Sequence, residues 1–436
     1  MGIDKQIAEL TDLNRLPFKI PKSKNECRFL VDEFDRRAKH GDNDNFESLD
    51  QAVFDYFEID DWDREYIADV VAFDLDFVRH GSKSEAARPS TVEHLKRYAS
   101  SLTEAIRADV DGSDVAVNCD VITGLNEVAA VAIQFDQPRN RKVGTKVAGQ
   151  FNDSERLAEL LHAPLTSTAK LRRSLHVYDG DCCIIVKHDQ RRFWSRARAQ
   201  DDADSILANC SSRWGSRLNQ PTQGNPNPDL RLRIQRGYLR TALHILHLAW
   251  PDVVADSQIS TSSEEDDITN LLRQQMVIVK RGMTPKPRME FHREPQSDMV
   301  DDGTELGLID IFVSYKNWDE AVYLAIECKR IRSDSNDLAR LYVNEGVCRF
   351  ASGKYSYGHA IAGMIGYVIC GDRDRCVERV AAQLEKEPDS DSGYNAEFGW
   401  QESNGWIDGE TQYLSQHEQH GISNSILLVH SFLLLS

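Results

Sequence analysis

Long apolar runs, paired cysteines and an excess of positive charge are all absent from this 436-residue sequence. No run of about 18 apolar residues occurs, which argues against a membrane-spanning helix. The N-terminal stretch MGIDKQIAELTDLNRLPFKI is polar and carries no apolar signal-peptide core. We therefore expect a cytoplasmic protein with no membrane partner.

The nine cysteines form no Cys-x-x-Cys pair, and several of them, such as Cys328 and Cys370, lie inside apolar runs. That usage is typical of reduced, buried thiols and not of a disulfide framework or a zinc site. The net charge of −18 argues against a simple non-specific DNA binder. A nucleic-acid site would need a local positive patch, metal ions or a partner that presents the substrate.

Several common enzyme motifs are also missing from the sequence. It contains no GxxxxGK[ST] phosphate loop, no HExxH metal motif and no GxSxG nucleophile turn. Any ATP-driven step would therefore belong to a separate subunit.

A polar stretch rich in proline and glycine, Asn219 to Pro228, predicts the clearest boundary in the chain. We expect a mixed α/β domain over 1–217, a linker over 218–230 and a second domain over 231–436. The first of these includes a strongly acidic segment, 55–76, with nine carboxylates and Arg64 as its only cation.

In the N-terminal half, periodicity predicts helices over 49–59 and 91–107, the second with a Ser or Thr cap. Alternating apolar residues predict strands over 114–122, 127–135, 174–178 and 182–187, the last two joined by a turn at Asp179-Gly180.

The C-terminal half gives a clearer order of elements. Helical patterns cover 233–250 and a segment that starts near Ser262, where the spacing to Glu265 predicts a capping box. The patterns that follow predict strands at 289–294, 307–315 and 321–330, a helix at 337–350, a strand at 361–370, a helix at 375–386 and a strand at 426–433.

Charged residues interrupt two of these apolar strands. Asp310 divides Leu308-Ile309 from Ile311-Phe312-Val313, and Glu327 and Lys329 follow the apolar run 321–326. Strand side chains alternate, so Glu327 and Lys329 point to the same face. A carboxylate among apolar residues is costly unless it is paired or holds a metal. The pattern therefore predicts a cation site, with a plain buried Asp310–Lys329 salt bridge as the alternative.

The aspartate on one strand, Glu-x-Lys on the next and the order α-β-β-β-α-β resemble the PD-(D/E)XK nuclease superfamily over about 257–386. Ile309 stands where the family often has proline. The resemblance implies an α/β (α+β) protein with a restriction-endonuclease-like αβββαβ core and a mixed α/β N-terminal domain.

The same resemblance implies roles for the charged residues. Asp310 and Glu327 would hold Mg²⁺, for which Mn²⁺ can substitute, and the backbone carbonyl of Cys328 would be a further ligand. Lys329 would orient or help deprotonate the attacking water. Glu264 or Glu265 matches a carboxylate that many members have beside the metal. The sequence does not separate these two, and a solvated first helical turn is the alternative.

Substrate contacts are predicted at two basic segments. GVCRFASGKYS, with Arg349 and Lys354, resembles segments of bacterial defence nucleases, and the alternative is a surface ion pair between Glu345 and Arg349. The run 187–198, with Arg191 and Arg192 beside Phe193-Trp194, has the cations and aromatics that bind single strands, or it forms a solvated face over core aromatics.

Segments 46–60, 88–106 and 186–206 resemble sequences found near N6-adenine DNA methyltransferase modules, but no methyltransferase motif is present. We predict a Mg²⁺-dependent DNA endonuclease of a bacterial restriction or anti-phage system. It would act as a homodimer or within a larger complex with a separate ATPase, methyltransferase or sensor subunit. The alternatives are an inactive adaptor or DNA-recognition subunit with the nuclease fold and, more weakly, a DNA repair or junction nuclease.

Overall fold

The computed structural model describes a mixed α/β protein, as the sequence predicts. The described residues are 28, 51, 53–54, 59, 61–110, 114–123, 128–136, 144–147, 174–211, 222–292, 309–315, 323–386, 399–419 and 425–435. They belong to two compact units, Met1–Ala86 and Ala87–Ser436. The predicted boundaries at 217 and 230 stay a prediction. None of the described helices is long and apolar enough to span a membrane.

The described part of the first unit is dominated by one helical segment that runs from Asp61 to His80. It consists of α4 (Asp61–Asp69), a π-helical turn η2 (Val70–Leu75) and α5 (Asp76–His80). The Asp76 carboxylate accepts hydrogen bonds from His80 Nδ1 at 2.7 Å and from the Ala86 amide at 3.4 Å. The helix predicted over 49–59 lies mostly outside the described residues.

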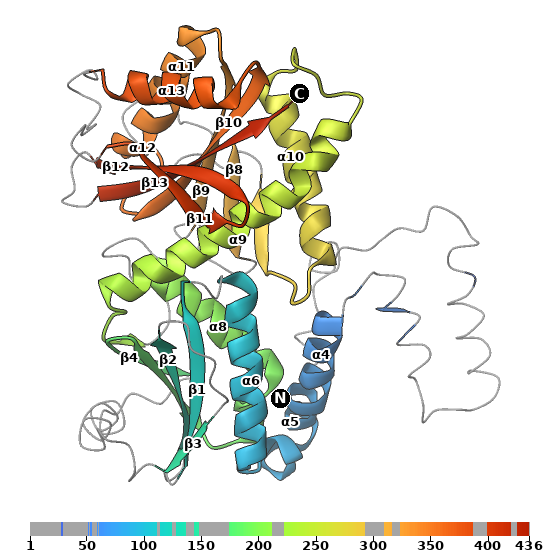
Figure 1. Cartoon of the computed structure of the whole chain (residues 1–436). Helices are drawn as coiled ribbons and strands as arrows, with labels where there is room; N and C mark the ends of the chain where they lie inside the picture. Colours follow the sequence, from blue (N-terminus) through green and yellow to red (C-terminus); the bar gives the residue numbers. More distant parts are fainter. Residues whose placement is uncertain are drawn as a thin grey trace, which may run out of the picture. The chain divides into compact units, whose positions relative to one another are not determined.

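The described residues of the second unit form two sheets (Figure 1). The first has the strand order β3-β1-β2-β5-β4-β6 and is accompanied by two helices, α6 (Val92–Asp109) and α8 (Arg196–Ser211). Its strands are β1 (Ala116–Thr123), β2 (Val128–Asp136), β3 (Gly144–Val147), β4 (Leu175–Asp179), β5 (Cys182–His188) and β6 (Thr222–Gln223).

Local chemistry explains how these elements begin and turn. Thr91 caps α6 by accepting a hydrogen bond from the His94 amide at 3.3 Å, which satisfies one of the free amides of the first turn. Gly180 has a φ of +59°, as the tight β4–β5 turn requires. The Thr91 cap agrees with the sequence prediction. The turn consists of Gly180 and Asp181, one position later than predicted, because Asp179 still pairs with Cys182.

The second sheet has the order β11-β12-β13-β10-β9-β8-β7. β7, β8 and β9 pair antiparallel, whereas β10 is parallel to both β9 and β13. Its strands are β7 (Met289–His292), β8 (Ile311–Tyr315), β9 (Leu324–Arg332), β10 (Ile361–Cys370), β11 (Gln401–Ile407), β12 (Glu410–Glu418) and β13 (Ser425–Leu434).

Helices accompany this sheet. They are α9 (Pro228–Ala255), α10 (Glu265–Gly282), α11 (Asn336–Tyr342), the π-turn η7 (Val343–Val347), α12 (Cys348–Ala351) and α13 (Arg373–Leu384). In Figure 1, α11 and α13 lie together beside the sheet, and α9 packs against α10 and α8. From α10 to β10 the elements follow the predicted α-β-β-β-α-β order.

One local prediction for this half is wrong, and another is confirmed with a change of helix type. The predicted capping box at Ser262 does not form, because Glu264 is the N-cap of α10 and makes no side-chain cap bond. The serines bond one another instead, with Ser263 Oγ accepting from the Ser260 amide at 2.9 Å. The helix predicted over 337–350 does form, because α11, η7 and α12 follow one another without a break. Its π-turn contains Gly346, which approaches the sheet so closely that an added Cβ would lie 2.6 Å from Met364 Cε.

The two faces of β9 meet different helices. Cys328 points toward α9 and α10, where its hydrogen-bonded neighbour Tyr367 stacks on Trp250 and bonds Thr269 at 3.1 Å. Glu327 and Lys329 point the other way, and an added Cβ at Gly346 would lie 3.7 Å from Lys329 Cγ. The alternation predicted for Glu327 and Lys329 is therefore the alternation observed.

Candidate active site

The register of β8 and β9 brings the two strand carboxylates together. Ile311 pairs with Ile326 in this antiparallel ladder, so Asp310, one residue earlier, faces Glu327, one residue later. Directly opposed residues point to the same side of a sheet. Burial raises the pKa of Asp310 above its ordinary value, against the opposing effects of the Lys329 charge and of the Cys328 amide.

Lys329 lies among three carboxylates. Its Nζ is 2.7 Å from Glu265 Oε1, 2.9 Å from Glu327 Oε1 and 3.7 Å from Asp310 Oδ2. Burial by itself would lower the pKa of Lys329, but the charges of Glu327, Asp310 and Glu265 outweigh it and raise the pKa. The ammonium is therefore charged at neutral pH. We call Glu265, Asp310, Glu327, Lys329 and Arg349 the Glu327 cluster.

Glu327 is fully buried, with two cations on one of its oxygens. Lys329 Nζ and Arg349 Nη1 contact Oε1 at 2.9 and 3.0 Å, whereas Oε2 has no hydrogen-bond partner among the described residues. Burial, followed by the charge of Asp310, raises the pKa of Glu327 to about 8. The two cationic partners therefore do not offset the effects of burial and of the Asp310 charge on this carboxyl group.

The backbone of Cys328 lies between the charged side chains. Its amide donates to Asp310 Oδ2 at 2.7 Å, and its carbonyl accepts from Lys329 Nζ at 2.8 Å. Burial raises the pKa of the Cys328 thiol well above its ordinary value, so this side chain is a neutral core group. Its carbonyl faces the cluster, as a metal ligand would need to do, but Lys329 uses it.

The structure separates the two glutamates that the sequence left equivalent. Glu265, the first residue of α10, bonds Lys329 through one oxygen and accepts from the Arg330 amide at 3.0 Å through the other. Glu264 has an extended backbone as the N-cap, is 70% exposed and pairs with the Arg330 guanidinium at 2.7 Å. Glu265 therefore belongs to the cluster and Glu264 to its exposed margin.

Arg349 reaches the cluster from α12. The same Nη1 that contacts Glu327 donates to the hydroxyl of Tyr355 at 2.8 Å. The Tyr355 amide in turn donates to the Arg349 carbonyl at 3.0 Å. Sequence reasoning missed Tyr355, although a buried tyrosine generally needs a partner for its hydroxyl. Lys354, its neighbour, is half-buried in the same loop.

Arg191 and Arg192 make their described contacts beside the first sheet and not with the Glu327 cluster. Arg191 donates to the carbonyl of Pro89 at 3.4 Å, and Arg192 lies over the ring of Phe193 at 4.4 Å. Trp194 is buried and packs edge-on against Tyr98, so it is a core residue. Lys187, from the same basic run, is buried as well.

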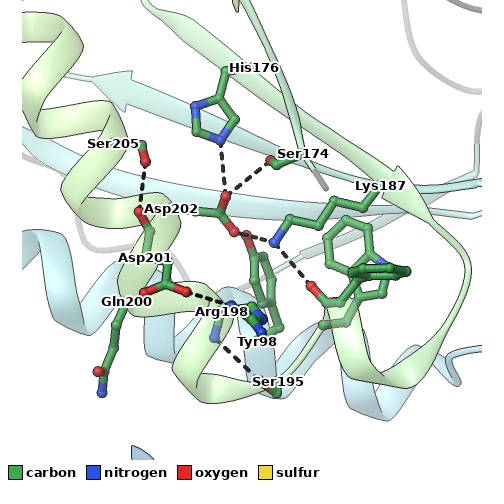
Figure 2. Close-up of polar contacts among 12 residues, drawn as sticks. Tyr98, Ser174, His176, Lys187, Ser195, Arg198, Gln200, Asp201, Asp202 and Ser205 are labelled. Atoms are coloured by element: carbon green, nitrogen blue, oxygen red, sulfur yellow. Dashed lines mark hydrogen bonds and ion pairs between the residues drawn. The ribbon is translucent and has the colours of Figure 1, made fainter. Parts of the chain in front are cut away.

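Lys187 belongs to a second buried cluster, which Figure 2 shows in detail. The Asp202 carboxylate accepts from the Tyr98 hydroxyl at 2.6 Å, from the Ser174 hydroxyl at 3.1 Å, from His176 Nε2 at 3.1 Å and from Lys187 Nζ. Burial alone would raise the pKa of Asp202, but Lys187 and His176 lower it below its ordinary value. We call Tyr98, Ser174, His176, Lys187 and Asp202 the Asp202 cluster.

The Glu327 cluster contains carboxylate oxygens, which are the donors that a hard cation prefers. Within the described residues, no group of three or more histidine, cysteine, aspartate and glutamate side chains that could hold a metal ion is found. Mg²⁺ does not need such a set, because one or two carboxylates with water and phosphate oxygens suffice. The opposed carboxylates of Asp310 and Glu327, and the partnerless Glu327 Oε2, meet that smaller requirement.

Comparisons of the chain with protein-family models, with curated proteins and with solved structures gave no match.

Proposed function

We propose that this protein is a Mg²⁺-dependent DNA endonuclease with a restriction-endonuclease-like core, and that it acts in a bacterial restriction or anti-phage system in the cytoplasm. One observation carries the proposal. A lysine, two opposed strand carboxylates and a helix carboxylate converge in a volume where Lys329 Nζ lies 2.7 to 3.7 Å from each carboxylate. That combination suits the hydrolysis of a phosphodiester.

Asp310 and Glu327 would hold the ion, with Mn²⁺ able to replace Mg²⁺. When bound, the ion would lower the pKa of a water molecule and balance the charge of phosphate oxygens. Glu327 Oε2 would be a ligand atom for the ion, because it is buried and has no hydrogen-bond partner among the described residues. The pKa of Glu327 is raised to about 8. The positive charge of a bound cation would lower that pKa and so favour the ionised carboxylate at neutral pH.

Lys329 would serve as a fixed positive charge. Its raised pKa makes it a poor base while the three carboxylates surround it. As an ammonium it can donate hydrogen bonds to the attacking water or to a phosphate oxygen and stabilise developing negative charge. Glu265, bonded to both Lys329 Nζ and the Arg330 amide, positions that ammonium.

The whole chain carries a net charge of −18, which repels DNA phosphates. DNA binding therefore requires local positive charge close to the cluster. Arg349 and Lys354 stay candidates for phosphate contact beside the cluster, and Arg191 and Arg192 for contact elsewhere. A homodimer would supply a second active site for the second strand, and a complex with an ATPase, methyltransferase or sensor subunit would be the source of further positive surface.

Cleavage of plasmid and linear DNA by the full chain tests the proposal, with Mg²⁺, Mn²⁺ or EDTA. We expect cutting that needs the metal and falls by at least about 100-fold in Asp310→Asn. Glu264→Gln is the matched control, since Glu264 lies at the exposed margin, and it should cut like the wild type. Metal-independent cutting, or equal cutting by Asp310→Asn, would contradict the proposal.

One observation favours a second candidate, an inactive adaptor with the same fold. Lys329 and Arg349 already neutralise Glu327 Oε1 without a metal, as they would in a purely structural ion cluster. Calorimetric titration with Mn²⁺ separates the two. Binding that Asp310→Asn abolishes supports the nuclease, and no binding by the wild type supports the adaptor.

A further inference from the structure

Arg349 uses only one nitrogen of its guanidinium for hydrogen bonds with the described residues. Nη1 donates to Glu327 Oε1 at 3.0 Å and to the Tyr355 hydroxyl at 2.8 Å. Nε and Nη2 have no hydrogen-bond partner among the described residues, and neither of these nitrogens is fully buried. The Arg349 side chain is 28% exposed, whereas that of Glu327 is 1% exposed. One edge of the guanidinium is therefore available to a ligand while the protein holds the other.

The unused edge of Arg349 has the geometry of an anion receptor. Nε–H and Nη2–H of a guanidinium form two parallel hydrogen bonds to a phosphate or a carboxylate. Arg332 uses the same edge on Asp334, where Nε and Nη2 lie 3.0 and 3.1 Å from the two carboxylate oxygens. Because Arg349 is already held through Nη1, it loses less freedom on binding a ligand, which favours affinity. An anion on this edge would lie beside the Glu327 cluster.

Tyr355 sets the direction of this guanidinium. Its side chain is fully buried, and burial raises the pKa of its hydroxyl, so the phenol is neutral and its oxygen accepts from Arg349 Nη1. The Arg349 guanidinium carbon also lies 5.5 Å from the centre of the Tyr355 ring, within the range of a cation–π contact. The Tyr355 amide donates to the Arg349 carbonyl at 3.0 Å. The two residues are therefore joined through both backbone and side chains.

The loop that carries Tyr355 is held in place by residues of two other segments. Ser356 has a φ of +52°, in the left-handed region that a serine rarely adopts. Its amide donates to the Tyr323 hydroxyl at 3.1 Å, and its carbonyl accepts from Gln419 Nε2 at 3.0 Å. Gln419 Oε1 accepts from the Gly358 amide at 3.0 Å. A strained backbone that its surroundings hold in this way is more frequent at functional sites than elsewhere.

We infer that Tyr355 is a positioning residue, which holds Arg349 so that its Nε and Nη2 bind a phosphate group of DNA beside the Glu327 cluster. This inference rests on the proposed function for its ligand, because DNA is the substrate proposed for that cluster. It adds a role for Tyr355 and assigns the phosphate contact to one edge of the Arg349 guanidinium.

The test measures binding of a short fluorescent DNA duplex to the full chain by fluorescence anisotropy, in EDTA so that no metal-dependent cleavage occurs. Arg349→Lys keeps the charge but loses the two-nitrogen edge, and it should bind at least about tenfold more weakly than the wild type. Tyr355→Phe removes only the hydroxyl and should weaken binding by about three- to tenfold. Arg340→Lys, at an exposed arginine of α11 that pairs with Asp337, is the matched control and should bind like the wild type.

Tyr355→Phe combined with Arg349→Met distinguishes positioning from a structural role. A hydroxyl that acts through the guanidinium has nothing to hold in the Arg349→Met background, so its removal there should have no further effect on DNA binding. A structural role of the hydroxyl would weaken binding in both backgrounds.

Three results would overturn the inference. The first is no DNA binding by the wild type, and the second is equal binding by Arg349→Lys. The third is an equal effect of Tyr355→Phe in the wild-type and Arg349→Met backgrounds.

The metal-dependent cleavage assay separates this inference from the proposed function. Cleavage that needs the metal, together with unchanged DNA binding by Arg349→Lys, would support the nuclease and overturn the phosphate contact. Weaker DNA binding by Arg349→Lys without any cleavage by the wild type would support the phosphate contact and contradict the nuclease.

Discussion

The Asp202 cluster and the Glu327 cluster each bury a lysine against carboxylates, but they differ in how completely the carboxylates are satisfied. Asp202 accepts four hydrogen bonds, and its pKa is lowered. Glu327 has two cations on one oxygen and no described partner on the other, and its pKa is raised to about 8.

The balance of charge explains the difference. In the Asp202 cluster one carboxylate accepts hydrogen bonds from one lysine and three further donors, so the Asp202 carboxylate itself is satisfied, whereas His176 Nδ1 has no hydrogen-bond partner among the described residues. In the Glu327 cluster three carboxylates share two cations, and the deficit falls on the most buried of them. A fully satisfied network specifies and rigidifies a core, whereas a buried group short of partners is a candidate for function. The first cluster therefore supports the fold, and the second is where a further cation would be stabilised.

The largest effect on stability is expected when a cation is removed from the satisfied cluster. Lys187→Met leaves the Asp202 carboxylate buried and unpaired, which should cost about 3–5 kcal/mol of unfolding free energy. Urea denaturation measures this. Arg198→Met, which breaks a partly exposed pair with Asp201, is the control and should cost about 1 kcal/mol or less. Equal costs would contradict the distinction between the clusters.

Matched amide substitutions should separate the two carboxylates. Asp202→Asn weakens hydrogen bonds to a charged acceptor and should cost about 2–3 kcal/mol. Glu327→Gln replaces a carboxyl group whose pKa is raised to about 8 with a neutral group of the same shape, and should change stability at pH 7 by about 1 kcal/mol or less. Thermal and urea unfolding measure the loss of unfolding free energy in both variants. A larger loss in Glu327→Gln than in Asp202→Asn would contradict the distinction between the two carboxylates.

The same glutamate should make stability depend on pH. Its folded pKa of about 8 lies above the ordinary value of 4.5, so the folded state holds the extra proton between these values. Stability from this group is therefore full below pH 4.5 and is lost as pH rises to about 8, by at most about 1.4 kcal/mol per pH unit.

Glu327→Gln removes this contribution. The difference in unfolding free energy between wild type and variant should therefore shift in favour of the variant from pH 5 to pH 8. Urea titrations at several pH values measure it, and a difference that does not change with pH would show that the carboxyl is already ionised.

The smallest effects are expected at the margin of the cluster. Glu265→Gln removes a charge that holds Lys329 and should lower cleavage by about tenfold, whereas Glu264→Gln loses only an exposed pair and should stay within about twofold. Initial rates of metal-dependent DNA cleavage measure both. A larger loss of cleavage rate in Glu264→Gln than in Glu265→Gln would mean that Glu264, and not Glu265, supports the reaction.

Much of the second sheet was predictable because its information is local. Strand β10 was predicted at its observed bounds, and alternation correctly set Glu327 and Lys329 on one face of β9. The wrong capping prediction also has a local cause, because the serines before α10 bond one another instead of capping it. The sequence pattern also did not indicate the π-turn, where Gly346 lies so close to the sheet that an added Cβ would be 2.6 Å from Met364 Cε.

Contacts that join distant segments could not be predicted. Tyr98 and Asp202 are 104 positions apart, and nothing in either segment indicates the other. Arg349 was considered as a phosphate contact, and its bonds to Glu327 and Tyr355 depend on how α12 packs on the sheet.

The sequence by itself determined that Asp310, Glu327 and Lys329 interrupt apolar strands, because strand periodicity is a property of neighbouring residues. Only the tertiary structure decided that Glu265, and not Glu264, holds Lys329. These residues are adjacent, but one is an extended cap and the other the first residue of a helix. The direction of each side chain follows from the packing of α10, whose buried Ile268, Leu272 and Met276 fix its rotation.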